Sequence, residues 1–259
     1  MYDSLDKIGL KAVLEAIKEK TPTVSNPNLL INPDFKINQR GISGTFSDTG
    51  EYFVDRWRLV SGTVTVNSDG TLTLNGTISQ ILENVVGENA AASVSAGSVA
   101  YDDTTKTFTI TGNGVTISWS KLEYGNTATP FIPPDPATEL LKCCRYFQVI
   151  RPGSPLLGFV VNSSRIRITM PVVSPMQKNP KVNMRQNTGN FTWSFRLTSA
   201  AGTSSFTAND FSAMSVIFIR TDGSSIELYI NVSHTMTTNE MVYASGSGGI
   251  YFELDSEIY

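Results

Sequence analysis

The chain has few charged residues, no basic cluster and no long apolar run. Only 17% of its 259 residues are charged, the net charge is -3 and the pI is about 5.3. This balance gives no long-range attraction for phosphate backbones, so we expect no nucleic-acid partner. No segment approaches the roughly 18 to 20 consecutive apolar residues that a membrane span needs, so we expect no membrane partner either.

Cysteine and histidine are too scarce for most metal or nucleophile chemistry. Cys143 and Cys144 are adjacent, so they cannot link distant parts of a fold, and a metal site would need further ligands. The pair is a vicinal disulfide switch or, more simply, two small side chains on a short helix; the sequence does not fix its redox state. His234, the single histidine, has no nucleophile motif around it. We expect no cofactor, no metal and no catalysis.

Three acidic residues keep one enzymatic alternative open. Asp48, Glu51 and Asp55 are close in sequence, and two carboxylates a few ångströms apart are enough for glycoside hydrolysis. Their spacing is unspecific, and acidic residues in turns are usually solvated. A glycan depolymerase is therefore the third of our functional hypotheses.

Residues 3–20 carry the one clear helical pattern. Apolar residues recur mainly at spacings of three and four, with charges between them, and Thr21-Pro22 ends the run. A single helix of this length is marginal in water. We expect it to pair with copies of itself or with a larger assembly, or else to fold back onto its own sandwich. The candidate contact residues are Leu5, Ile8, Val13, Leu14 and Ile17.

From residue 28 to residue 123 the apolar period changes from helical to two, which is typical of strands with one buried face. Asp69-Gly70 and Asn113-Gly114 each lie between alternating runs and predict two hairpins. Repeated short strands with no helix between them favour an antiparallel β-sandwich or jelly roll.

A proline-rich stretch at 130–136 separates this region from the rest, and we expect it to set the angle between two modules. Asp135-Pro136 predicts the start of a short helix, and alternating strands then return from Phe147, with hairpins at 162–164 and at Asp222-Gly223. The predicted fold is mainly β, with a short N-terminal helix and two antiparallel, jelly-roll-like β-sandwiches. The predicted divisions are 1–22, 26–134 and 135–259.

The three tryptophans offer either core packing or platforms for a sugar ring. Trp119 is in phase with Val115 and Ile117, so we expect it to be buried. Trp193 is the least certain, although its in-phase phenylalanine neighbours favour the core. The receptor contacts are unknown at this stage, and Trp193 is the one candidate.

Several phrases, taken together, resemble bacteriophage tail-fibre and receptor-binding proteins. The first region is similar to the carbohydrate-binding-like sandwich of many such fibres, and the second is similar to a fibre tip domain. The phrases are NLLINPDFKINQRG, YFVDRWRL, WSKLEYGNTATPFIPPDP, ATELLKCCRYFQ, ITMPVVSPMQKNPKV and IYFELDSEI. Within them, Asp55 and Arg56 look like a framework pair and Trp57 like a core aromatic, as opposed to receptor contacts.

The resemblance implies a homotrimer whose N-terminal helices form a short bundle and attach to other virion proteins. It implies a protein that is made in the host cytoplasm and located in the virion, in a tail or capsid fibre. The expected partner is bacterial surface polysaccharide, bound without catalysis. The alternative is a virion decoration or connector protein that binds other phage structural proteins.

Overall fold

The computed structural model describes residues 25–87, 89–151, 156–185, 192–199, 202–208, 214–221, 225–232, 235–238, 240–247 and 251–259. Within them the protein is mainly β, with four antiparallel sheets and one α-helix, which confirms the predicted class. The predicted helix in 1–22, with its five candidate contact residues, lies outside the described residues, as does His234. Trimerisation and the jelly-roll topology stay predictions.

Two sheets of unequal size enclose the first hydrophobic core. The larger has the order β1-β3-β4-β7-β6 with β2 also paired to β3, and the smaller pairs β5 with β8. The strands are β1 (Gly44–Phe46), β2 (Tyr52–Val54), β3 (Trp57–Val66), β4 (Leu72–Ile81), β5 (Ala90–Val94), β6 (Ser98–Asp102), β7 (Thr107–Ile117) and β8 (Ser120–Tyr124).

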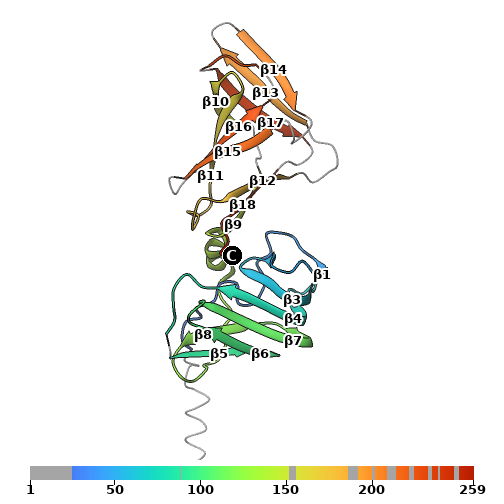
Figure 1. Ribbon diagram of the computed structural model, residues 1–259, viewed down its shortest axis with the longest axis vertical. Coiled ribbons are helices and arrows are strands. Elements are labelled where there is room, and N and C mark those ends of the chain that lie inside the picture. Colours follow the sequence, from blue (N-terminus) through green and yellow to red (C-terminus); the bar gives the residue numbers. More distant parts are fainter. Residues whose placement is uncertain are drawn as a thin grey trace, which may run out of the picture.

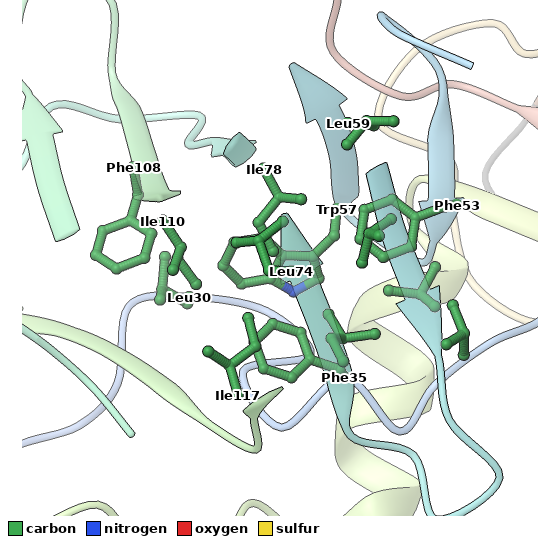
Figure 2. Packing of buried hydrophobic residues seen from close by; sticks show 14 of the residues in the cluster. Leu30, Phe35, Phe53, Trp57, Leu59, Leu74, Ile78, Phe108, Ile110 and Ile117 are labelled. Carbon is green, nitrogen blue, oxygen red and sulfur yellow. The ribbon is translucent and has the colours of Figure 1, made fainter. Parts of the chain in front are cut away.

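Aromatic side chains fill the centre of this core (Figure 2). Trp57 is fully buried, with its ring edge-on to Phe35 at 5.1 Å and to Phe108 at 6.2 Å between ring centroids. Its indole nitrogen donates a hydrogen bond of 2.8 Å to the carbonyl of Asn32, so its one polar atom is satisfied. The segment before the first strand is therefore tied to the core, and the core role predicted for Trp57 is confirmed.

The two predicted hairpins of this region had different outcomes. β3 and β4 pair across Asp69-Gly70, where Gly70 has a φ of +84° and Asp69 accepts a hydrogen bond from the amide of Thr71, so that hairpin is confirmed. The hairpin at Asn113-Gly114 is wrong, because both residues lie inside β7. Gly114, with a φ of +67°, is the extra residue of a β-bulge opposite β4.

Trp119 is not part of the core. β7 ends before it, and its side chain is partly exposed and stacked on Phe131 at 5.1 Å between ring centroids. The prediction that it is buried in phase with Ile117 is wrong. The strand period does not continue through the break between β7 and β8, and the proline-rich stretch returns to cover one face of the indole.

Helix α2 (Pro136–Cys144) follows the proline-rich stretch as predicted. Asp135 is its N-cap and accepts a hydrogen bond of 2.8 Å from the amide of Thr138, and Pro136 occupies the first turn, where its missing N–H costs nothing. The helix buries Glu139, Cys143 and Cys144. It leads directly into the second set of strands.

A seven-stranded and a three-stranded sheet enclose the second core. Their orders are β14-β13-β17-β10-β11-β16-β15 and β12-β18-β9. β10 pairs with β11 and β15 with β16 in antiparallel fashion, as the predicted hairpins require, and Asp222-Gly223 lies outside the described residues. The strands are β9 (Phe147–Ile150), β10 (Leu156–Asn162), β11 (Arg165–Pro171), β12 (Lys181–Arg185), β13 (Thr192–Ser199), β14 (Gly202–Ala208), β15 (Met214–Thr221), β16 (Ser225–Val232), β17 (Met241–Ser247) and β18 (Tyr251–Asp255).

The molecule is elongated (Figure 1). The first sandwich and the seven-stranded sheet lie at opposite ends, and α2 with the three-stranded sheet lies between them. The C-terminus returns to this middle region after β18, instead of ending at the far sheet. Side chains from both parts of the chain therefore meet at the middle.

A pair of glycines tests how closely β3 and β4 approach. Gly62 and Gly76 face each other, and a Cβ on Gly62 would lie 2.1 Å from the carbonyl oxygen of Asn75. We expect Gly62→Ala to lower the free energy of unfolding by at least about 3 kcal/mol, because a backbone clash adds to the cost of its φ of +76°. Gly114→Ala is the control, since its φ is also positive but its Cβ would have open space; we expect about 1 kcal/mol. Equal losses in urea denaturation would contradict the close approach.

Candidate functional site

A buried ion pair joins the two sandwiches. Arg56, directly after β2, pairs through Nη1 with Oε2 of Glu257, from the segment after β18, and its backbone amide donates to Oε1 of the same carboxylate at 3.1 Å. The two side chains are at most 1% exposed. The guanidinium also lies over the ring of Tyr146 at 3.6 Å and donates to the carbonyl of Ile81. Arg56 itself has a φ of +70°, a conformation that non-glycine residues rarely adopt.

A second cation reaches the same carboxylate. Arg40 Nη2 lies 3.5 Å from Glu257 Oε1, and its guanidinium covers the ring of Phe147 at 3.8 Å. Lys178 Nζ donates to the backbone carbonyl of Glu257 at 2.8 Å. Glu257 therefore binds cations from both parts of the chain, and these contacts compensate for removing it from water.

Asp55 and Gln39 extend this network toward β9. The backbone amide and the side-chain amide of Gln39 each donate to the Asp55 carboxylate at 2.7 Å, and the side-chain amide also donates to the carbonyl of Phe147 at 2.7 Å. Burial raises the pKa of Asp55 to about 6, although Arg40 and the hydrogen bonds from Gln39 oppose the shift. We call the six residues of this network the polar joint: Gln39, Arg40, Asp55, Arg56, Tyr146 and Glu257.

Further contacts hold α2 and the residues after it against the first sandwich. Glu139 Oε1 accepts a hydrogen bond of 2.7 Å from the amide of Asn32. Glu83, in the loop after β4, accepts hydrogen bonds from Tyr146 Oη at 2.8 Å and from Arg145 Nε at 3.1 Å. The three carboxylates Glu83, Glu139 and Glu257 thus hold the two parts of the chain together at separate points.

A pocket of about 200 Å³ opens beside the polar joint, and we call it the joint pocket. Arg56 and Tyr146 form part of its wall. The rest is built from the loop after β4, the segment before the first strand and the end of β8: Leu29, Ile31, Gln80, Leu82, Glu83, Asn84, Val85, Val86 and Tyr124.

The seven-stranded sheet, which belongs to the second sandwich (called the far sandwich below), exposes an apolar stripe. Leu157, Phe159 and Val161 alternate along β10 with their side chains outward, and Met241 of β17 pairs with Phe159. Phe159 is 49% exposed and has the guanidinium of Arg167 over its ring at 5.9 Å. β10 is the central strand of its sheet, so this stripe lies in the middle of the outer face.

The residues considered for catalysis or redox chemistry do not form a reactive site in the structure. Asp55 is fully buried, whereas Asp48 and Glu51 are exposed near the turn before β2, so Asp55 cannot be one of a solvent-facing carboxylate pair. Cys143 and Cys144 are free and buried, and burial raises the pKa of both thiols, that of Cys144 to about 11. The described residues hold no cluster of metal ligands.

Trp193, the candidate receptor contact, lies in β13 opposite Ala208 of β14 and Gly246 of β17. Its side chain is outside the described part of the chain, so its role as a contact stays a prediction. Sequence reasoning gave no role to Glu257, Arg40 or the joint pocket. No signal in the sequence singles out Glu257, because Glu253 and Asp255 of the same closing segment also have no cation near them in sequence.

The chain matches no known protein family, no curated protein and no solved structure. Among the described residues, no helix has the length and the apolar character to cross a membrane.

The Arg56–Glu257 pair predicts strong coupling in a double-mutant cycle. Removing one partner leaves the other charge buried and unpaired, so we expect Arg56→Met and Glu257→Gln each to cost about 3 to 5 kcal/mol of unfolding free energy. The double variant should cost clearly less than the sum of the two, because no lone charge remains.

The control for this cycle is an exposed ion pair. Arg185 and Glu253 lie 3.0 Å apart with the Arg185 side chain 56% exposed, so Arg185→Met should cost at most about 1 kcal/mol. Additive losses from the two joint variants in urea denaturation would show that the buried pair does not act as a unit.

Asp55 predicts a fall in stability as the pH rises from about 4 to about 6. Its pKa is about 6 in the folded protein and near 3.8 when unfolded, so the folded state holds the extra proton in this window. Above pH 6 the buried charge costs roughly 3 kcal/mol relative to the protonated form. Asp55→Asn should remove this pH dependence from the unfolding free energy, measured against the wild-type protein. If the unfolding free energy of the wild type relative to Asp55→Asn instead rises over this pH window, the hydrogen bonds from Gln39 outweigh the effect of burial on the pKa of Asp55.

Proposed function

We propose that this protein is a phage virion fibre or receptor-binding protein that attaches to bacterial surface glycans without catalysis. The observation that supports this most is that the sequence motifs similar to fibre proteins meet at the polar joint. NLLINPDFKINQRG supplies Gln39 and Arg40, YFVDRWRL supplies Asp55 and Arg56, ATELLKCCRYFQ supplies Tyr146, and IYFELDSEI supplies Glu257. Phrases from four separate parts of the chain thus build one network.

This convergence gives the resemblance a physical meaning. The likeness to fibre proteins lies in how one sandwich is fixed against another, and not in a set of receptor contacts. A fibre must hold its binding surface away from the virion in a defined direction, and a buried network of paired charges favours one orientation over others. The elongated arrangement in Figure 1 suits that task.

The trimer belongs to the same proposal. Three copies of the N-terminal helix would bundle through the apolar residues at positions 5, 8, 13, 14 and 17, and would attach to other virion proteins. Three weak glycan sites acting together raise avidity by roughly 10² to 10⁴ without new contacts. Weak individual sites are therefore compatible with firm attachment.

The exposed stripe on β10 favours the second candidate function, a decoration or connector protein. Leu157, Phe159 and Val161 place apolar area in the middle of a sheet face, and such area is typical of protein docking surfaces. In that case the far sheet would contact another virion protein and not a glycan.

Binding of the purified, labelled protein to a panel of bacterial strains separates the two candidates. An adhesin should bind some strains, and soluble polysaccharide from the same strains should compete. Binding to virions that are depleted of the protein, with no binding to any strain, would favour the connector. Release of reducing ends from the polysaccharide would overturn the non-catalytic part of the proposal.

The trimer makes its own prediction. Light scattering should give three times the chain mass of 28.2 kDa at micromolar concentration. Leu5→Asp combined with Ile8→Asp should give a monomer, because charges inside a helix bundle are costly, whereas Asp6→Asn should leave the mass unchanged. A wild-type protein with the mass of one chain would contradict the trimer.

A further inference from the structure

Aliphatic side chains form one part of the lining of the joint pocket, whereas its most buried lining residues, Arg56, Gln80 and Tyr146, are polar. Leu29 and Ile31 line it from the segment before the first strand, and Leu82 and Val86 line it from the loop after β4. Val85, in the same loop, is 55% exposed at the wall. A ligand that fills this part needs at least one apolar group, such as a methyl.

The outer part combines an open aromatic ring with polar side chains. Tyr124, at the end of β8, is 58% exposed. Asn84 is exposed in the loop after β4, and the partly buried carboxylate of Glu83 lies beside it in the sequence. An aromatic face next to an amide and a carboxylate suits a sugar ring, whose C–H face packs on the aromatic ring while its hydroxyls bond the polar groups.

The charged side chains at the pocket already have ion-pair partners within the protein, although the buried Nε of Arg56 has no hydrogen-bond partner. Arg56 pairs with Glu257, and Glu83 pairs with Arg145 and accepts a hydrogen bond from Tyr146. A charged ligand would have to compete with these contacts or lose its hydration without a partner. A neutral ligand carries no such cost.

We propose that the joint pocket binds a single neutral sugar ring that carries an acetamido group. The volume of about 200 Å³ lies below the roughly 300 to 1,000 Å³ of sites for drug-sized ligands, which suits one ring and not an oligosaccharide. Tyr124 covers the apolar face of the ring and the acetamido methyl contacts the aliphatic side chains. The Glu83 carboxylate accepts hydrogen bonds from the polar groups of the ligand, and the Asn84 amide accepts or donates them. The inference rests on the proposed glycan attachment and names the unit that is recognised.

N-acetylglucosamine is the probe for this proposal, used with the full chain in saturation-transfer NMR and titration. We expect a Kd of roughly 1 mM, as suits a small ligand in a half-open site. Glucose, without the acetamido group, and N-acetylneuraminic acid, which is charged, should each bind at least about tenfold more weakly. Glucose binding equal to that of N-acetylglucosamine would overturn the acetamido assignment.

Two variants locate the site. Tyr124→Ala should weaken binding of N-acetylglucosamine at least about tenfold, and Asn84→Ala should weaken it by a smaller factor. Phe159→Ala is the matched control, because Phe159 is another half-exposed aromatic but belongs to β10. That strand lies in the seven-stranded sheet, at the end of the molecule away from the first sandwich (Figure 1). Thermal unfolding of all three variants checks that they fold. Absent binding to the wild-type protein, or equal binding to Tyr124→Ala, would overturn the proposal.

Measuring the binding of the protein to bacterial cells distinguishes a failure of the proposed sugar site from a failure of the proposed attachment function. If Tyr124→Ala loses the monosaccharide but still adheres to bacteria as the wild type does, the pocket does not serve attachment and its glycan role is overturned. If the wild type binds N-acetylglucosamine through Tyr124 but adheres to no strain, the pocket stands and the adhesin function fails.

Discussion

The buried pair of Arg56 and Glu257 is the interaction on which the arrangement of the protein depends. Neither charge can be taken out of water alone at an acceptable cost, so each is stable only when the other is in place. Arg56 belongs to the first sandwich, whereas Glu257 lies in the segment directly after β18, the last strand of the second. The two sandwiches must therefore be docked on each other before either charge is stable in its buried position.

The remaining contacts of the joint follow from this condition. Arg40 and Lys178 add cations around Glu257, and Tyr52 donates a hydrogen bond to the carbonyl of Ile258. Tyr259 packs edge-on against Tyr52 at 5.4 Å between ring centroids. The last three residues of the chain thus contribute more to docking the first sandwich than to the core of the second.

Local signals in the sequence predicted much of the fold. The N-cap at Asp135 and the hairpin at Asp69-Gly70 depend on residues close together, and both were confirmed. The hairpin predicted at Asn113-Gly114 was wrong because β7 continues through these residues in its pairing with β4, and the turn-like sequence forms a β-bulge. The predicted burial of Trp119 was wrong because β7 ends two residues before it.

The candidate site could not be predicted in the same way. Its central pair joins residues 201 positions apart, and no local pattern indicates which carboxylate a buried arginine will meet. That the proline-rich stretch sets the angle between the modules stays a prediction, and the buried contacts between the modules come from residues on either side of this stretch. The joint pocket likewise requires five separate segments that only the tertiary fold brings together.

The pairing of β9 with β18 has a consequence for how the far sandwich could vary. The chain leaves the middle of the molecule through β9, returns to it once through β12 and re-enters it finally through β18; β9 and β18 are neighbours in the small sheet that also holds β12. The span from β10 to β17, which includes β12, is therefore a segment whose exit and return lie side by side. Such a segment could be exchanged for another as a cassette, with the anchoring half of the molecule and the end of the chain left unaltered.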